Sequence, residues 1–84
     1  MYYAYILLCC DNKTYVGGSD NLKERVERHK MGYVPATKNR LPVRLIAYFA
    51  FVDEHVAFAF EKYLKSGSGR AFMKKHIFSG KKNL

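Results

Sequence analysis

Glu61 is the last acidic residue of this 84-residue chain, and a lone carboxylate at the start of a cationic segment has two chemical explanations. It can hold a divalent metal whose other ligands are water and phosphate oxygens, because Mg²⁺ uses only one or two protein carboxylates. It can equally form an i,i+4 ion pair with Lys65, a surface contact worth about 0.3 to 0.5 kcal/mol. The sequence spacing does not choose between the two.

The positive charge of the chain is concentrated after Glu61. Fifteen Lys and Arg against seven Asp and Glu give a net charge of +8, and no acidic residue follows Glu61. Aromatic residues alternate with the basic ones, as expected of a surface that follows a phosphate backbone, although a solvated helix face is the competing interpretation. The candidate nucleic-acid-binding residues are Lys62, Lys65, Arg70, Lys74 and Lys75, together with Lys38 and Arg40 in an earlier segment.

Two tyrosines and an arginine follow one another at intervals of ten: Tyr5, Tyr15 and Arg25. The chain has seven tyrosines, so this spacing carries little weight alone, and half-buried aromatic residues are the simpler interpretation. His29 lies one helical turn after Arg25, and both border the apolar stripe of the helix expected there. Side chains in that position can reach a neighbouring site or simply cover the core.

Length and composition limit the class of protein. Hydrophobic residues make up 49% of the chain, which excludes intrinsic disorder, and 84 residues leave room for one core. No apolar run approaches the roughly 18 residues of a membrane span, and the N-terminus lacks the basic flank of a signal peptide, so we expect a cytoplasmic protein without membrane association. The adjacent Cys9 and Cys10 suit neither a disulfide nor a metal site. The excess positive charge favours an anionic partner, most often nucleic acid.

The residue pattern predicts strands and helices in a mixed order. In the first half we expect a strand at 2–9, a strand at 14–16 ended by Gly17-Gly18, a helix capped by Ser19 or Asp20 that ends at Met31, and a loop at 33–42. In the second half we expect a strand at 43–52 covered on both faces, a helix capped by Asp53 that ends near Leu64, a break at 66–69, and a helix at 68–78.

Without regular βαβ alternation, this order predicts an α+β fold, in which about three helices flank a three-stranded antiparallel sheet. We expect a single domain at 1–79 and a basic C-terminal tail at 80–84. The second helix is expected to turn Val56, Ala59, Phe60 and Tyr63 inward and to carry Glu61 on its flank.

As a whole, these motifs resemble those of the GIY-YIG nuclease family. Tyr3-Ala4-Tyr5 corresponds to the GIY element and Tyr15-Val16-Gly17 to the YIG element, and the segment 20–29 continues the match. The stretches 37–48 and 61–70 are similar to the small stand-alone bacterial members, relatives of the catalytic domain of a bacterial excision-repair nuclease. The resemblance extends over nearly the whole chain.

The resemblance implies hydrolysis of phosphodiester bonds with one divalent metal, Mg²⁺ or Mn²⁺. The roles that it implies are a metal ligand at Glu61, a phosphate clamp at Arg25, tyrosines beside the scissile phosphate at Tyr5 and Tyr15, an auxiliary residue at His29, and the glycine of the strand end at Gly17. The attacking water must lose a proton, and Tyr5, Tyr15 or His29 could accept it. A phenol near pKa 10 needs nearby positive charge for this task.

Three positions depart from the family pattern. Tyr3 stands in place of a glycine, the second glycine of Gly17-Gly18 stands where some relatives carry a lysine, and Met73 stands where some larger relatives carry an asparagine. We expect an endonuclease-like domain acting on DNA, with RNA not excluded, in repair or recombination. The alternatives are a nucleic-acid-binding module without catalysis and a protein-interaction domain. A chain this short also leaves room for a protein partner that supplies substrate specificity.

Overall fold

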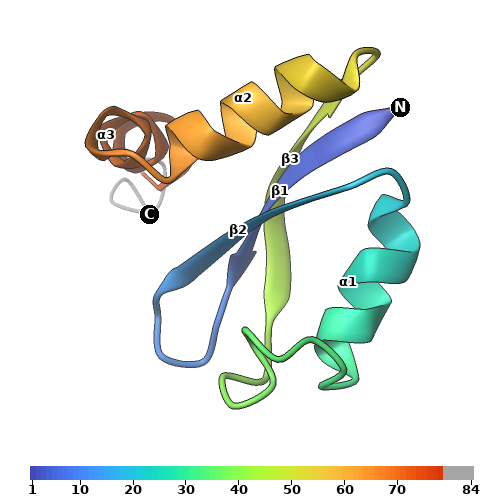
Figure 1. Ribbon diagram of the computed structural model, residues 1–84. Coiled ribbons are helices and arrows are strands. Elements are labelled where there is room, and N and C mark those ends of the chain that lie inside the picture. The colour runs from blue at the N-terminus through green and yellow to red at the C-terminus, as the bar shows by residue number, and fades with distance from the viewer. Residues whose placement is uncertain (79–84) are drawn as a thin grey trace.

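In the computed structural model, which describes residues 1–78, three strands form one antiparallel sheet of order β2-β1-β3 (Figure 1). The strands are β1 (Tyr2–Leu8), β2 (Thr14–Ser19) and β3 (Arg44–Phe51), and the helices are α1 (Leu22–Lys30), α2 (Glu54–Leu64) and α3 (Gly67–His76). The central strand β1 carries four consecutive buried residues, Ala4 to Leu7, because both of its faces are covered. The expected α+β fold with three strands is confirmed.

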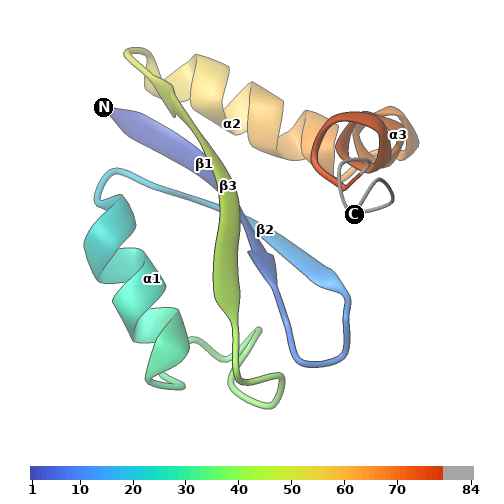
Figure 2. The same cartoon turned by 180° about the vertical axis from the view of Figure 1, so that it is seen from behind.

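The helices lie on opposite faces of this sheet, as the two views in Figures 1 and 2 show. On one face, Ala4 and Ile6 of β1 form a core with α2 and α3, and aromatic side chains from β3 and both helices pack around it. On the other face, Tyr5 and Leu7 form a second core with Val26 of α1. Alternation along β1 therefore assigns Tyr5 to the α1 face.

β2 is longer than its residue types predict. Gly17 and Gly18 do not end the strand, because they pair with Tyr5 and Ala4 of β1 and the ladder continues to Ser19. Ser19 is still extended, and the N-cap of α1 is Asn21, whose side chain accepts a hydrogen bond from the backbone N–H of Glu24 at 3.2 Å. The expected caps Ser19 and Asp20 were therefore wrong by one or two residues.

α2 is rotated relative to the expected orientation. Asp53 caps it as expected, but Ala57 and Leu64 are its buried residues, while Val56 is 49% exposed and Ala59 and Tyr63 are also exposed. Of the side chains expected to face inward, only Phe60 is part of the core. Ala57, Glu61 and Leu64 follow the i, i+4, i+7 pattern of one helix face, so Glu61 faces the sheet.

The remaining elements follow the predicted order with shifted ends. β3 is covered on both faces only in part, since Tyr48 is 55% exposed. α3 begins at Gly67 behind the N-cap Ser66 and ends at His76. The expected tail at 80–84 lies outside the described residues. None of the helices in residues 1–78 has both the length and the apolar character that crossing a membrane requires.

Candidate active site

A buried hydrogen-bonded chain of three side chains connects β1, α1 and the loop after α1. The phenol oxygen of Tyr5 lies 2.8 Å from Nε2 of His29, and Nδ1 of His29 lies 2.7 Å from the hydroxyl of Thr37. All three residues have no exposed surface. Burial, and then the nearby Arg25 charge, lower the pKa of His29, so the imidazole is neutral at pH 7. One of its nitrogens therefore donates a hydrogen bond and the other accepts one.

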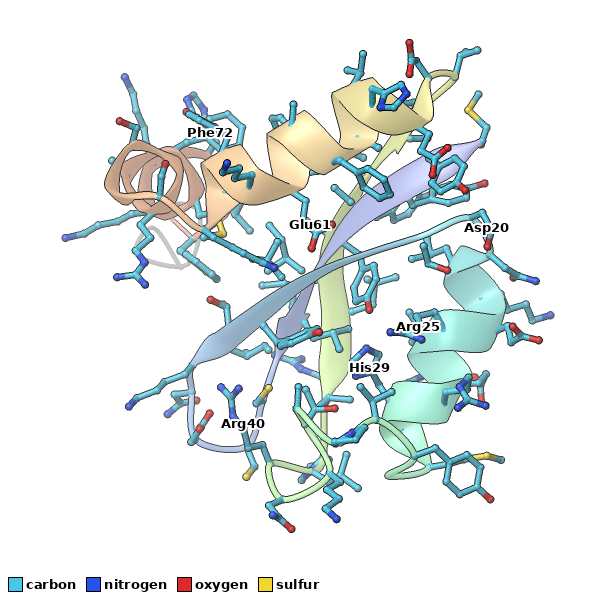
Figure 3. The ribbon with its side chains drawn as sticks, viewed as in Figure 1. Asp20, Arg25, His29, Arg40, Glu61 and Phe72 are labelled. Atoms are coloured by element: carbon cyan, nitrogen blue, oxygen red, sulfur yellow. The ribbon has the colours of Figure 1, made fainter. Side chains whose placement is uncertain are left out.

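Tyr15 and Arg25 lie beside this buried chain and nearer to solvent. The Tyr15 ring centroid is 5.2 Å from that of His29 and 6.4 Å from that of Tyr5, and Tyr15 is half-buried. Arg25 and His29 both project from α1 toward the strands (Figure 3). Burial raises the pKa of Tyr5, and the Arg25 guanidinium lowers it by less. Among the described residues, Nε of Arg25 is buried and has no hydrogen-bond partner.

The glycine pair of β2 makes space on both faces of the sheet. On the α1 face, a Cβ at Gly17 would lie 2.5 Å from the phenol oxygen of Tyr5. On the other face, a Cβ at Gly18 would collide with the carboxylate of Glu61. Successive residues of a strand point to opposite faces, so each glycine admits one of the two side chains. If residues 17 and 18 carried a Cβ, the Tyr5 phenol and the Glu61 carboxylate could not keep their present positions against β2.

Glu61 projects from α2 toward the sheet (Figure 3), and 21% of its side chain remains exposed. Its Oε2 accepts a hydrogen bond from Nζ of Lys65 at 3.0 Å, so the i,i+4 ion pair considered from the sequence does form. Residues 1–78 contain no cluster of three or more His, Cys, Asp or Glu that could hold a metal by themselves. One partly exposed carboxylate above a glycine nevertheless fits a cation whose other ligands are water and phosphate oxygens.

The structure brings the sequence-predicted residues together in two groups. Tyr5, Tyr15, Arg25 and His29 form one group on the α1 face, and Glu61 approaches the same part of β2 from the α2 face; its charge contributes to the raised pKa of Tyr5. Met73, at the position where some larger relatives carry an asparagine, is a core residue that is 5% exposed.

Thr37 is a site residue that the sequence did not reveal. A threonine in a loop bounded by prolines has no periodicity that would mark it as buried, and only its contact with His29 identifies it.

The candidate nucleic-acid-binding residues have different environments. Arg40 forms an ion pair with Asp11, with Nε 3.0 Å from Oδ2, which ties the loop to the turn between β1 and β2. Lys65 is paired with Glu61. The others are exposed side chains of the loop, α2 and α3: Lys38, Lys62, Arg70, Lys74 and Lys75. Arg40 therefore has a structural contact as well as a charge, whereas Arg70 is an exposed side chain of α3 with no ion pair among residues 1–78.

Two tyrosines, an arginine and a histidine thus lie on one face of the three-stranded sheet, and a glutamate lies on the other. The family model described as the GIY-YIG catalytic domain matches residues 1–76, and the chain belongs to this family. Domains of the family are generally nucleases that act on DNA and use a divalent metal. The family resemblance expected from the motifs is thus confirmed.

Relatives named UPF0213 proteins are similar to most of the chain. This chain is 45% identical over 65 residues to the UPF0213 protein from Lacticaseibacillus paracasei, and the match covers 76% of this chain and 73% of the relative. It is 40% identical over 82 residues to one from Pediococcus pentosaceus, which covers 93% and 86%. The solution NMR structure of a UPF0213 protein from Bacillus halodurans has a TM-score of 0.56 and 30% identity, and it covers 89% of this chain and 84% of that one. The name of these relatives specifies no activity.

Proposed function

We propose that this chain is a divalent-metal-dependent endonuclease that hydrolyses DNA phosphodiester bonds, with a role in repair or recombination. The observation that carries the proposal is the convergence at Gly17 and Gly18 of β2. Glu61 approaches from the α2 face, and Tyr5, beside the Arg25 guanidinium, approaches from the α1 face. An anionic substrate at this part of β2 would meet both a carboxylate suited to a metal and a guanidinium.

Arg25 is the residue proposed to hold the scissile phosphate. A guanidinium presents five N–H donors in a planar fork, which suits the nonbridging oxygens of a phosphate, particularly as charge develops on them. Its buried Nε lacks a partner among the described residues, and such unsatisfied groups are uncommon in folded proteins. No solvent reaches Nε in this structure, so a phosphate oxygen would satisfy this donor only after a shift of the Arg25 side chain.

Tyr15 is the better candidate of the two tyrosines for accepting the proton of the attacking water. Tyr5 has no exposed surface, its phenol is hydrogen-bonded to His29, and its pKa is raised, mainly by burial, so it remains protonated. Tyr15 is half-buried and packs against the His29 ring. We therefore assign Tyr5 and His29 to positioning the site, and Tyr15 to contact with the water.

Glu61 is the residue proposed to hold the metal, Mg²⁺ or Mn²⁺. When bound, the metal would supply Lewis-acid stabilisation of the phosphate and of the leaving oxygen. For this chemistry the Glu61 carboxylate needs open space over β2. Gly18 provides that space because it has no Cβ. Lys65 is paired with Oε2 of this carboxylate, so Oε1, which lies over Gly18, is the oxygen that could bind a metal without breaking the ion pair.

The test is a cleavage assay with plain, nicked and branched DNA in the presence of Mg²⁺ or Mn²⁺. We expect cleavage by the wild-type chain that chelation abolishes and that Glu61→Gln reduces at least about a hundredfold, since removing one charge-stabilising group typically has that effect. Glu27→Gln, which changes an exposed carboxylate of α1, is the matched control and should keep full activity. Equal cleavage by wild type and Glu61→Gln would refute the assignment, and binding without any cleavage would favour the non-catalytic module.

A further inference from the structure

Two cations that are far apart in the sequence lie together beside the turn of the hairpin. Lys13 precedes β2 and Arg70 belongs to α3, yet both border one open pocket of about 670 Å³ between the hairpin and α3. The other lining residues are Leu8, Asn12, Thr14 and Phe78. The lining therefore combines two positive charges, two small polar side chains and two apolar ones, with no carboxylate among them.

Neither cation is neutralised by an ion pair within the described part of the chain. The two ion pairs formed by residues 1–78 are Arg40 with Asp11 and Lys65 with Glu61. Asp11 is the nearest acidic residue in sequence to Lys13, but its carboxylate accepts hydrogen bonds from the Arg40 guanidinium and from the backbone N–H of Lys13. The pocket thus keeps a net positive field that attracts an anion.

The pocket and Glu61 lie along the same face of β2. Thr14, which lines the pocket, and Gly18, which lies under Glu61, are four residues apart on one strand and point to the same side. At about 3.3 Å per residue, roughly 13 Å separate them. An unpaired strand is not held to the axial rise of about 3.4 Å of a duplex, so this distance places the pocket within a few nucleotides of Glu61 along the strand.

We propose that the pocket lined by Lys13, Arg70 and Phe78 binds a nucleotide of the substrate strand a few steps from the scissile bond. Lys13 and Arg70 contact its phosphate, and its base packs against Phe78. This inference rests on the proposed function, because it takes Glu61 as the position of the scissile bond. It supplies the chain with a second contact to the same strand, remote from the catalytic residues.

A nucleotide suits this lining better than an acidic peptide does. Binding surfaces for single-stranded nucleic acid combine cations that follow the backbone with an aromatic ring on which a base stacks. Phe78 packs in part against the core on the α2 face, and it and Leu8 are both half-buried. A carboxylate side chain would use the two cations but would not cover the apolar surface that these two residues leave exposed in the pocket. The observed mixture therefore favours an unpaired or frayed strand over a fully paired one.

The first test measures binding without cleavage, by fluorescence anisotropy of a labelled single-stranded 12-mer at several salt concentrations in EDTA, in a Glu61→Gln background. Arg70→Gln and Lys13→Gln should each weaken binding about three- to tenfold and reduce the slope of log affinity against log salt by about one. Lys30→Gln removes the same charge from an exposed position on α1 and is the matched control. Equal effects of all three substitutions would overturn the proposal.

The second test separates the base contact from the charge. Phe78→Leu keeps an apolar side chain, and we expect it to weaken binding of the 12-mer about tenfold while leaving the salt slope unchanged. Unfolding in urea controls for a loss of structure. A loss of binding to polyglutamate that is as large as the loss for the 12-mer would identify an acidic peptide as the ligand and overturn the proposal. Because no metal or cleavage is involved, failure here is distinguishable from failure of the nuclease assignment.

Discussion

The phenol oxygen of Tyr5 lies 2.8 Å from Nε2 of His29, and neither residue has any exposed surface. This hydrogen bond joins the central strand β1 to α1 through the middle of the core on that face of the sheet. His29 is in turn fixed from its other side by Thr37. The imidazole therefore has both nitrogens occupied inside the protein, which is the condition under which a neutral histidine is stable when buried.

Thr37→Val should destabilise the protein by about 1 to 3 kcal/mol, because it replaces the hydroxyl by a methyl group of similar shape and leaves Nδ1 of His29 buried without a partner. The measurement is the free energy of unfolding from urea titration. Thr37→Ser keeps the hydroxyl and is the matched control, expected to lose less stability than Thr37→Val. If valine were tolerated as well as serine, the Thr37 hydroxyl would have no part in holding His29.

The stability of the chain should fall as the pH is lowered through the region below about 6.5, the ordinary pKa of histidine. His29 has a lowered pKa in the folded state, chiefly because of its burial. In this window the unfolded chain binds a proton that the folded chain does not, so acid favours unfolding. Asp11 has a pKa held below its usual value by Arg40, and it contributes only at lower pH.

Urea unfolding of the wild-type chain and of His29→Gln at pH 7, 6 and 5 tests this pH dependence. The glutamine variant should be less stable at pH 7 but should lose less stability between pH 7 and 5 than the wild type. His55→Gln, at an exposed position in α2, is the control for a surface histidine. An unchanged pH slope in His29→Gln would show that His29 is not the group that titrates.

The order of elements could be predicted from the sequence, whereas the placement of Glu61 could not. Apolar residues in α2 form two possible stripes, and the one without a carboxylate is the natural choice by hydrophobicity. The structure uses the other stripe, because Gly18 leaves space for the Glu61 side chain on the sheet. That space depends on two residues that are 43 positions apart, Gly18 and Glu61. The burial of Thr37 against His29, eight residues earlier, likewise depends on how the loop after α1 folds back on the helix. Local patterns contain neither.

Lys65→Gln should tighten metal binding at Glu61 about twofold to tenfold, provided that Glu61 is the metal ligand. Lys65 donates a hydrogen bond to Oε2 of Glu61 at 3.0 Å and places a positive charge where a divalent cation would bind. The exposed ion pair itself contributes little to stability, so the fold should be unaffected. Titration calorimetry with Mn²⁺ in the absence of DNA measures the affinity. Lys62→Gln removes a charge from an exposed position of α2 and should have the smaller effect; a weaker affinity in Lys65→Gln would exclude the competition.

Gly18→Ala should abolish most of the metal-dependent cleavage while leaving the fold intact. The new Cβ would collide with the carboxylate of Glu61, which is the flexible end of a side chain and can turn away at little cost in stability. The carboxylate then no longer lies over β2, and we expect activity to fall at least tenfold because a misplaced catalytic group costs that much or more. Gly67→Ala is the matched control, since a Cβ there meets no atom within 4 Å and alanine suits α3 better than glycine does. It should be fully active and as stable as the wild type or more so. Full activity in Gly18→Ala, with circular dichroism and unfolding unchanged, would mean that the chemistry does not depend on Glu61 lying at this glycine.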